Sequence, residues 1–144
     1  MTEALAEAEK AARLGETPVG AVVVSPSGEI VARGHNLVLT GRDPTGHAEI
    51  VALRRACLTT ASERLPGFDL YVTLEPCAMC AAAVSFARIR RLYFGALDEK
   101  GGAVESGVRF FSSRTCHHSP EVYGGIAEAR SASLLREFFL ARRL

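Results

Sequence analysis

The residues that could do chemistry lie in two short stretches. His47 is followed two positions later by Glu49, and Cys77 is followed three positions later by Cys80. Zinc prefers nitrogen and sulfur ligands in a tetrahedron, and a catalytic zinc keeps three protein ligands and leaves the fourth position for water. His47, Cys77 and Cys80 supply three such ligands, and Glu49 is then a carboxylate beside the metal, placed as a proton shuttle rather than a ligand. The two stretches together predict a catalytic zinc site.

Composition bounds the molecule that carries this site. A chain of 144 residues has the size of one domain, and we expect residues 1–144 to form a single domain. Four cysteines without a disulfide framework favour a reducing cytoplasm, and no stretch has the apolar length of a signal peptide or of a membrane span. The formal net charge is +1, so any surface that binds nucleic acid must be local.

Helical and strand patterns alternate along the chain and position the two stretches. They predict a helix at residues 2–14 and a hairpin of two strands at 18–24 and 29–34. A helix from about residue 45, a strand at 69–74, a helix from 76, a strand at 90–95 and a final helix at 128–143 follow. Such alternation predicts parallel strands covered by helices on both faces, with both helix starts at one edge of the sheet. Between Ala96 and Tyr123 the pattern fades, and long irregular loops are usually functional.

The site sets conditions on the starts of two helices. Asp43 or Thr45 is expected to cap the helix that carries His47 and Glu49 in its first turn. Residues two apart on an ideal helix point to nearly opposite sides, so the pair converges only if His47 lies where the backbone is barely helical. Pro76 suits the first position of the next helix, and there a spacing of three puts both cysteine sulfurs on one face, where the helix dipole favours thiolates.

The same residues allow other interpretations. Cys77-Ala78-Met79-Cys80 alone is typical of a thioredoxin-type redox pair, and a structural zinc site is a further alternative. Neither alternative assigns a function to Glu49. Cys116-His117-His118 would be a second metal site, although adjacent ligands suit no tetrahedral motif. Cys57 is expected in the core, as is Phe138, whose neighbour Phe139 is an alternative base-stacking residue.

The H-x-E and P-C-x-x-C pattern is the signature of the zinc-dependent nucleobase deaminases. Over about residues 16–143 the chain resembles the bacterial tRNA-specific adenosine deaminases. The resemblance is carried by Pro18-Val19-Gly20-Ala21, Gly34-His35-Asn36, Asp43 to Glu49, Leu70 to Cys80 and Leu134-Leu135-Arg136-Glu137-Phe138-Phe139. The zinc motif specifies the superfamily, and Tyr71 to Cys77 with the Phe-Phe ending narrows it to the tRNA enzymes. Gly46 stands where the family often has alanine, and the segment from Gly101 to His118 departs from the family's loop.

The resemblance implies an α/β fold of the three-layer α/β/α, cytidine-deaminase-like type, with a five-stranded mixed sheet. It also implies a cytoplasmic homodimer with one zinc per subunit that hydrolyses the wobble adenosine of a tRNA anticodon to inosine. In the family an asparagine after the second strand contacts the base, here Asn36, and an aspartate after the fourth strand lies near the nucleotide backbone, here Asp98. We expect the dimer interface to involve the cysteine-bearing helix, where Ala81, Ala82, Ala83 and Ser85 make a smooth stretch.

The substrate class remains open at this point. Arginines cluster in two places that would give a local basic surface, at Arg88, Arg90 and Arg91 and at Arg136, Arg142 and Arg143. Arg142 and Arg143 are the expected contacts to RNA. A free base or nucleoside, such as guanine or cytosine, is the alternative substrate for the same zinc centre, and a non-catalytic zinc or redox module is the third interpretation.

Overall fold

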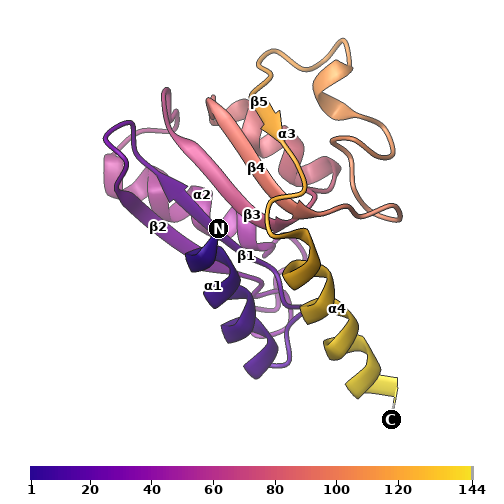
Figure 1. Ribbon diagram of the computed structural model, residues 1–144. Coiled ribbons are helices and arrows are strands. Elements are labelled where there is room, and N and C mark those ends of the chain that lie inside the picture. The colour runs from indigo at the N-terminus through magenta and orange to yellow at the C-terminus, as the bar shows by residue number, and fades with distance from the viewer. Residues whose placement is uncertain (144) are drawn as a thin grey trace.

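A five-stranded sheet forms the centre of the molecule (Figure 1). The computed structural model describes residues 1–143, and the side chain of Arg143 lies outside the described part. The strands have the order β2-β1-β3-β4-β5, with bounds β1 Gly20–Val24, β2 Ile30–His35, β3 Asp69–Leu74, β4 Arg91–Ala96 and β5 Glu121–Tyr123. β1 is antiparallel to β2 and β3, whereas β3, β4 and β5 are parallel to one another. The sheet is therefore mixed, as expected.

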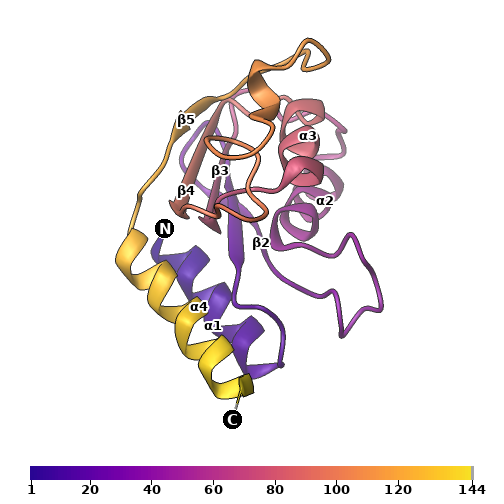
Figure 2. The same ribbon diagram turned by 90° about the vertical axis from the view of Figure 1, so that its right-hand side faces the viewer.

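Helices cover both faces of this sheet. Figure 2 shows α1 and α4 on one side of the strands and α2 and α3 on the other. The helices are α1 Thr2–Arg13, α2 Ala48–Thr60, α3 Ala78–Phe86 and α4 Glu128–Arg143, and a short 3-10 helix, η1, spans Phe110–Ser112. The expected α/β/α architecture is confirmed. No helix among residues 1–143 is long and apolar enough to cross a membrane.

Small residues of α2 let this helix lie close to the sheet. Ala48, Ala52 and Ala56 recur at helical spacing and are fully buried. Leu70 and Val72 of β3 belong to the same core, together with Leu92 and Phe94 of β4. Because side chains alternate between the two faces of a strand, the residues between them face α1 and α4. Cys57 packs at the margin of the core and is half-buried, and Phe138 is buried.

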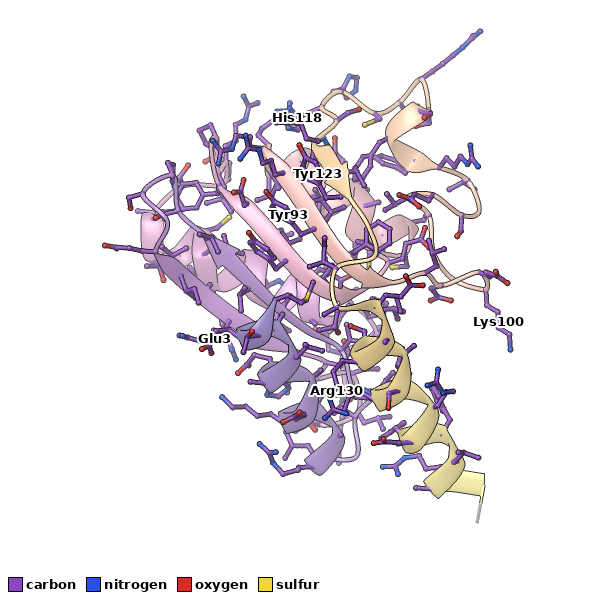
Figure 3. The ribbon with its side chains drawn as sticks, viewed as in Figure 1. Glu3, Tyr93, Lys100, His118, Tyr123 and Arg130 are labelled. Carbon is purple, nitrogen blue, oxygen red and sulfur yellow. The ribbon has the colours of Figure 1, made fainter. Side chains whose placement is uncertain are left out.

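The face of α1 and α4 is only partly covered. Tyr71, Tyr93 and Tyr123 form a row across β3, β4 and β5, with ring centroids 4.3 Å and 5.1 Å apart. Tyr93 and Tyr123 lie on the part of the sheet that α1 and α4 leave open (Figure 3). Tyr71 and Tyr93 are the third residues of β3 and β4, and Tyr123 is the last residue of β5.

One of the two expected basic clusters lies beside this row. Arg90 binds the Asp69 carboxylate through two nitrogens at 3.1 and 3.2 Å, and Arg91 lies 3.3 Å from Glu121. Arg88 donates to the carbonyl of Ser85. β3 and β4 run from the end that carries these arginines towards the cysteines. The arginines therefore lie at the opposite end of the strands from the metal ligands. They do not provide a basic surface at the site.

Candidate metal centre and active site

The two cysteines lie where the chain leaves β3 and enters α3. Cys77 is the N-cap residue of α3 with an extended backbone (φ −73°, ψ 177°), and Cys80 follows one turn later and is fully buried. Pro76 therefore lies before the helix rather than at its first position, and it is the one-turn spacing that brings both sulfurs to the same side. Free backbone N–H groups at this helix start favour anionic sulfur.

The start of α2 brings the histidine and the glutamate together. His47 is the N-cap of α2, with φ −70° and ψ 153°, so its backbone is extended and the condition set by the sequence is met. Glu49 lies in the first turn. The expected cap was wrong, because Asn36 Oδ1 accepts the N–H of Ala48 at 2.8 Å, whereas Asp43 accepts the N–H of Thr45 instead. A side chain from the end of β2 thus fixes the turn that carries the histidine.

The geometry of the three ligand residues fits a tetrahedral zinc. His47 Nδ1 lies 3.5 Å from Cys77 Sγ and 3.5 Å from Cys80 Sγ. Zinc bonds of about 2.3 Å to sulfur and about 2.0–2.1 Å to nitrogen, at a tetrahedral angle, place nitrogen and sulfur about 3.5 Å apart. All three ligand atoms lie within 4.8 Å of one another. The zinc-binding triad expected from the sequence is therefore assembled with room for one ion.

A second metal site is not formed in the described part of the chain, where the triad is the one group of metal-ligating side chains found. His118 Nε2 lies 2.7 Å from the carbonyl of Ile89, at the amino end of β4 (Figure 3). Cys116 Sγ donates to the carbonyl of His118. The N–H of His118 also donates to Ser85 Oγ of α3 at 3.3 Å, so these residues hold the segment before β5 against α3 and the start of β4, and the sequence pattern at 116–118 has a structural role.

The two thiols differ in acidity because they share one proton. The pKa of Cys77 falls to about 4, first because Cys80 donates a hydrogen bond to its sulfur and also because of the neighbouring His47. The pKa of Cys80 is raised by that same bond and by burial. One sulfur is thus anionic at neutral pH, which is the form that binds a metal.

Glu49 lies beside the triad in a dry environment. It is almost completely buried, and burial is the main reason that the pKa of its carboxyl is raised to about 7. A carboxylate with a pKa near neutrality both accepts and releases a proton, which a shuttle requires. The carboxyl faces the space in front of the metal ligands, because Glu49, His47 and Cys77 all line one cavity.

This cavity has a volume of about 420 Å³ and collects the residues on which the functional prediction rests. Asn36 and Asp98, the two expected nucleotide contacts, line it together with Glu49. Cys80 lies behind its wall. The residues that the sequence did not single out as parts of the site are Glu16, Thr17, Val19, Val38, Leu39, Leu74, Glu75 and Gly101.

Arg142 does not line the cavity; it lies on α4 beside the residues that follow α1. Its guanidinium stacks 3.8 Å above the ring of Phe138. It also lies against Gly15, where an added Cβ would be 3.3 Å from Nη2, and the next residue, Glu16, lines the cavity. The side chain of Arg143 lies outside the described residues. Phe139 is exposed and contacts Phe138 edge to face.

Two further buried carboxylates, those of Glu16 and Glu75, line the cavity, and the sequence does not show which groups they bind. Glu16 accepts hydrogen bonds from the N–H of Leu39 and from the N–H and hydroxyl of Thr40. Burial alone would raise the pKa of Glu16, but these bonds outweigh it and hold the pKa below its ordinary value. Glu75 is also ionised more readily than usual, because its hydrogen bonds lower its pKa more than burial raises it. Of the three carboxylates, only Glu49 has a pKa near neutrality.

Comparison with known proteins agrees with this site. Residues 1–96 match the model of the cytidine and deoxycytidylate deaminase zinc-binding region. The chain is 60% identical, over all 144 residues and 94% of the relative's length, to the tRNA-specific adenosine deaminase of Agrobacterium fabrum. It is 43% identical over 139 residues to the enzyme of the same name from Bacillus subtilis, with 96% of this chain and 86% of that protein covered.

Solved structures extend the likeness to the fold. A structure from studies of A-to-I editing by tRNA:A34 deaminases superposes with a TM-score of 0.92 at 61% identity, covering 94% of this chain and 97% of the other. Guanine deaminase from Nitrosomonas europaea superposes with a TM-score of 0.82 at 25% identity, covering 95% and 81%. By sequence, fold and metal site, the chain belongs to the zinc-dependent cytidine and deoxycytidylate deaminase family, in the group of tRNA-specific adenosine deaminases.

Proposed function

We propose that this protein hydrolyses the wobble adenosine of a tRNA anticodon to inosine, with release of ammonia. The observation that carries the proposal is that Glu49, with a pKa of about 7, shares one cavity with His47 and Cys77 of a triad that fits tetrahedral zinc. A redox or purely structural use of the cysteines would leave this buried, protonatable carboxyl without a role. The 60% identical relative supports tRNA adenosine as the substrate.

The chemistry follows from the residue types. His47, Cys77 and Cys80 hold one zinc, which when bound supplies Lewis-acid activation of water near neutral pH. Glu49 accepts the proton of the attacking water as the bond from oxygen to C6 of the adenine forms. Glu49 delivers this proton to N1, and it then accepts the proton of the new C6 hydroxyl and passes it to the exocyclic amine, so that ammonia leaves as the bond from C6 to that nitrogen breaks. The carboxyl of Glu49 is ionised at the end of the cycle, as it is at the start.

Asn36 is proposed to orient the base. Its Oδ1 is engaged by the N–H of Ala48, so its Nδ2 is the group left to donate to an acceptor atom of the base. Asp98 lines the same cavity at the carboxyl end of β4 and is proposed to lie near the nucleotide backbone. Arg142 and Arg143 are proposed to contact phosphates of the RNA.

The size of the cavity suits a single base taken out of its stack. An enzyme that acts on one base must extrude it, and a loop has already lost much of the stacking that opposes extrusion. Deamination of a free purine is the second candidate function, because guanine deaminase from Nitrosomonas europaea shares the fold. The two functions differ in whether contacts outside the cavity matter.

The discriminating experiment compares substrates under identical conditions. An anticodon stem-loop with adenosine at the wobble position is incubated with the zinc-loaded protein beside free adenine, guanine and cytosine. We expect inosine in the stem-loop and no ammonia from the free bases. A matched stem-loop with adenosine moved into the paired stem is the control and should not react. Turnover of a free base at the same rate as the stem-loop would favour the second function.

We further propose that residues 1–144 act as one catalytic domain and that two copies form a cytoplasmic homodimer. α2 and α3 enclose an open apolar cleft of about 900 Å³ on the outer side of the molecule. Leu58 and Phe86 at this cleft are 81% and 69% exposed. Exposed apolar area of this kind is typical of an interface. Ala83 also lines the cleft, whereas Ala81 and Ser85 of the same helix are buried inside the chain's own core.

A further inference from the structure

The carboxylate of Glu75 has an unusually complete set of hydrogen bonds. Its Oε2 accepts the N–H groups of Val104, Glu105 and Ser106 at 3.1, 2.9 and 2.9 Å. Its Oε1 accepts the N–H of Asp98 at 3.0 Å and the hydroxyl of Ser106 at 2.9 Å. The side chain is 2% exposed, and all five donors come from the loop between β4 and η1 (residues 97–109). One buried anion thus holds both ends of a loop segment.

The β4–η1 loop is anchored by this anion at four of its backbone N–H groups. It contains no helix or strand, and in Figure 3 Lys100 extends from it away from the molecule. Its backbone wraps tightly around the carboxylate, since a Cβ added at Gly102 would lie 2.5 Å from Glu75 Oε1 and 2.5 Å from the carbonyl oxygen of Asp98. A single further backbone bond, from the N–H of Ala103 to the carbonyl of Pro76, ties the loop to the start of α3.

The same loop forms part of the wall of the substrate cavity. Asp98 and Gly101 line that cavity, and so does Glu75 itself. Asp98 in turn accepts the N–H groups of Lys100 and Gly101 through Oδ1, which fixes its carboxylate relative to the loop. Glu75 therefore fixes the position of the loop, and the loop fixes the position of Asp98.

We propose that Glu75 is a positioning residue for the RNA substrate, which holds the β4–η1 loop as a wall of the cavity and sets where Asp98 meets the nucleotide. The inference rests on the proposed function and deepens it. Glu75 is neither a metal ligand nor a proton carrier in this account, although it lies two residues before Cys77. Loss of the clamp should weaken substrate binding more than it slows the chemical step.

A carboxylate is required here, and an amide of the same shape cannot replace it. Both oxygens of Glu75 accept from donors, three on one and two on the other. In Glu75→Gln the NH2 group must face at least two of these donors, whichever way the amide turns, and buried donors that lose their acceptor are costly. The substitution therefore breaks the clamp with almost no change in volume.

The test uses the zinc-loaded full chain with Glu75→Gln and, as a matched control, Glu105→Gln. Glu105 lies on the same loop and is exposed, so the control removes the same charge without removing the clamp. Zinc content, amide hydrogen exchange of residues 98–106 and the kinetics of inosine formation on the anticodon stem-loop are measured for each. We expect Glu75→Gln to keep one zinc per chain, to exchange the loop amides at least about tenfold faster, and to raise KM about tenfold with kcat changed less than about threefold. Glu105→Gln should match the unsubstituted protein.

The milder Ser106→Ala keeps the proposal testable if Glu75→Gln fails to fold. It removes one of the five donors and leaves the carboxylate in place, so KM should rise by a smaller factor in the same direction. Unchanged exchange and unchanged KM in the variants would overturn the proposal. A fall in kcat together with loss of zinc would also overturn it, because Glu75 would then support the metal centre instead. If the unsubstituted protein deaminates a free base and not the stem-loop, the proposed function fails. The clamp is then tested with that base, and unchanged amide exchange of the loop or an unchanged KM for the base in Glu75→Gln would overturn it.

Discussion

Three buried carboxylates around one cavity behave differently because their surroundings differ. Glu49 is buried with few partners, and its pKa is raised to about 7. Glu16 and Glu75 are equally buried, but three and five hydrogen bonds stabilise their charged forms. Burial sets the direction of a pKa shift only when hydrogen bonds to the charged form do not outweigh it. One carboxyl is left able to carry a proton, and two are fixed as anions.

Glu16 should make the stability of the protein depend on pH on the acid side. Its folded-state pKa lies below the ordinary value of 4.5, so its contribution is complete above that value and is lost as the pH falls through the folded-state pKa. The hydrogen bonds from Thr40 and Leu39 lower the pKa of Glu16 most, and the electrostatic contribution of His35 is smaller. Glu16→Gln should lower the free energy of unfolding by roughly 1 to 3 kcal/mol at pH 7 and by progressively less below about pH 4.

Urea unfolding of both proteins at pH 7, 5 and 3 measures this difference. Glu29→Gln removes an exposed carboxylate on the β1–β2 hairpin and serves as the control, with an expected change within about 0.5 kcal/mol at every pH. A difference between Glu16→Gln and the unsubstituted protein that stays constant from pH 7 to pH 3 would contradict the assigned hydrogen bonds.

The sequence could identify residues whose spacing is tied to chemistry, and it could not identify residues whose role depends on distant partners. His47 and Glu49, like the two cysteines, are close in the chain, so a metal site can be recognised from local spacing. Glu75 takes its donors from residues 23 to 31 positions away in the chain. Glu75 stands next to Pro76-Cys77 of the zinc motif, but neither its neighbours in the chain nor those of Glu16 show which groups bind the carboxylate. Only the fold brings the partners together.

The alternation of helix and strand along the sequence predicted the order of the elements better than the pairing of the strands and the capping of the helices. β2 and β3 run in the same direction although they are not neighbours, because β1 lies between them and is antiparallel to both. The segment that forms β5 is three residues long and carries no periodicity, so its pairing with β4 could not be predicted from the residues themselves. The cap of α2 could not be predicted for a related reason. Asn36, whose Oδ1 accepts the N–H of Ala48, lies 12 residues before Ala48 in the chain.

Close packing of α1 on the sheet depends on a glycine in β1. A Cβ added at Gly20 would overlap the carbonyl oxygen of Ala4 and would lie 2.5 Å from the backbone nitrogen of Ala8. Gly20→Ala should therefore displace α1 and lower the free energy of unfolding by roughly 1 to 3 kcal/mol. Gly46→Ala is the control, since its added Cβ would meet its nearest atoms at 3.2 Å, and it should change stability by less than about 1 kcal/mol. Thermal unfolding measures both, and equal effects of the two substitutions would show that α1 does not pack as described.

At the scale of the whole molecule, apolar and basic surfaces lie in different places. The apolar cleft of α2 and α3 is on one face of the sheet, while Arg142 belongs to α4 on the other face (Figure 2). The cavity with the metal ligands opens at the carboxyl ends of β3 and β4, between these layers. This arrangement leaves the cleft available for a second copy while α4 remains available to RNA.

The apolar cleft should bind a second copy of the chain. Leu58→Glu with Phe86→Glu places two charges in the proposed interface and should shift the protein from the mass of two chains to the mass of one, measured by light scattering at micromolar concentration. Leu140→Glu, which changes an exposed leucine of α4 in the same way, should leave the mass of two chains unchanged. A single-chain mass for the unsubstituted protein would contradict the dimer.

Arg142 should contribute to RNA binding through phosphate. Arg142→Ala should raise KM for the stem-loop and reduce the slope of log K against log salt by roughly 0.7, the value for one contact to a single strand. Zinc content should not change, since Arg142 lies outside the cavity. Arg136→Ala on the same helix is the control for loss of an exposed charge. An effect of Arg142→Ala that is independent of salt would assign the residue to packing on Phe138 instead.

The central claim is that Glu49 moves protons at a zinc site without binding the metal. The most direct measurement determines zinc content and single-turnover inosine formation on the same samples of the unsubstituted protein, Glu49→Ala and Cys77→Ala. We expect one zinc per chain and a loss of activity of at least about a hundredfold for Glu49→Ala, and loss of both zinc and activity for Cys77→Ala. Loss of zinc from Glu49→Ala, or inosine formation by it at an unchanged rate, would contradict the account.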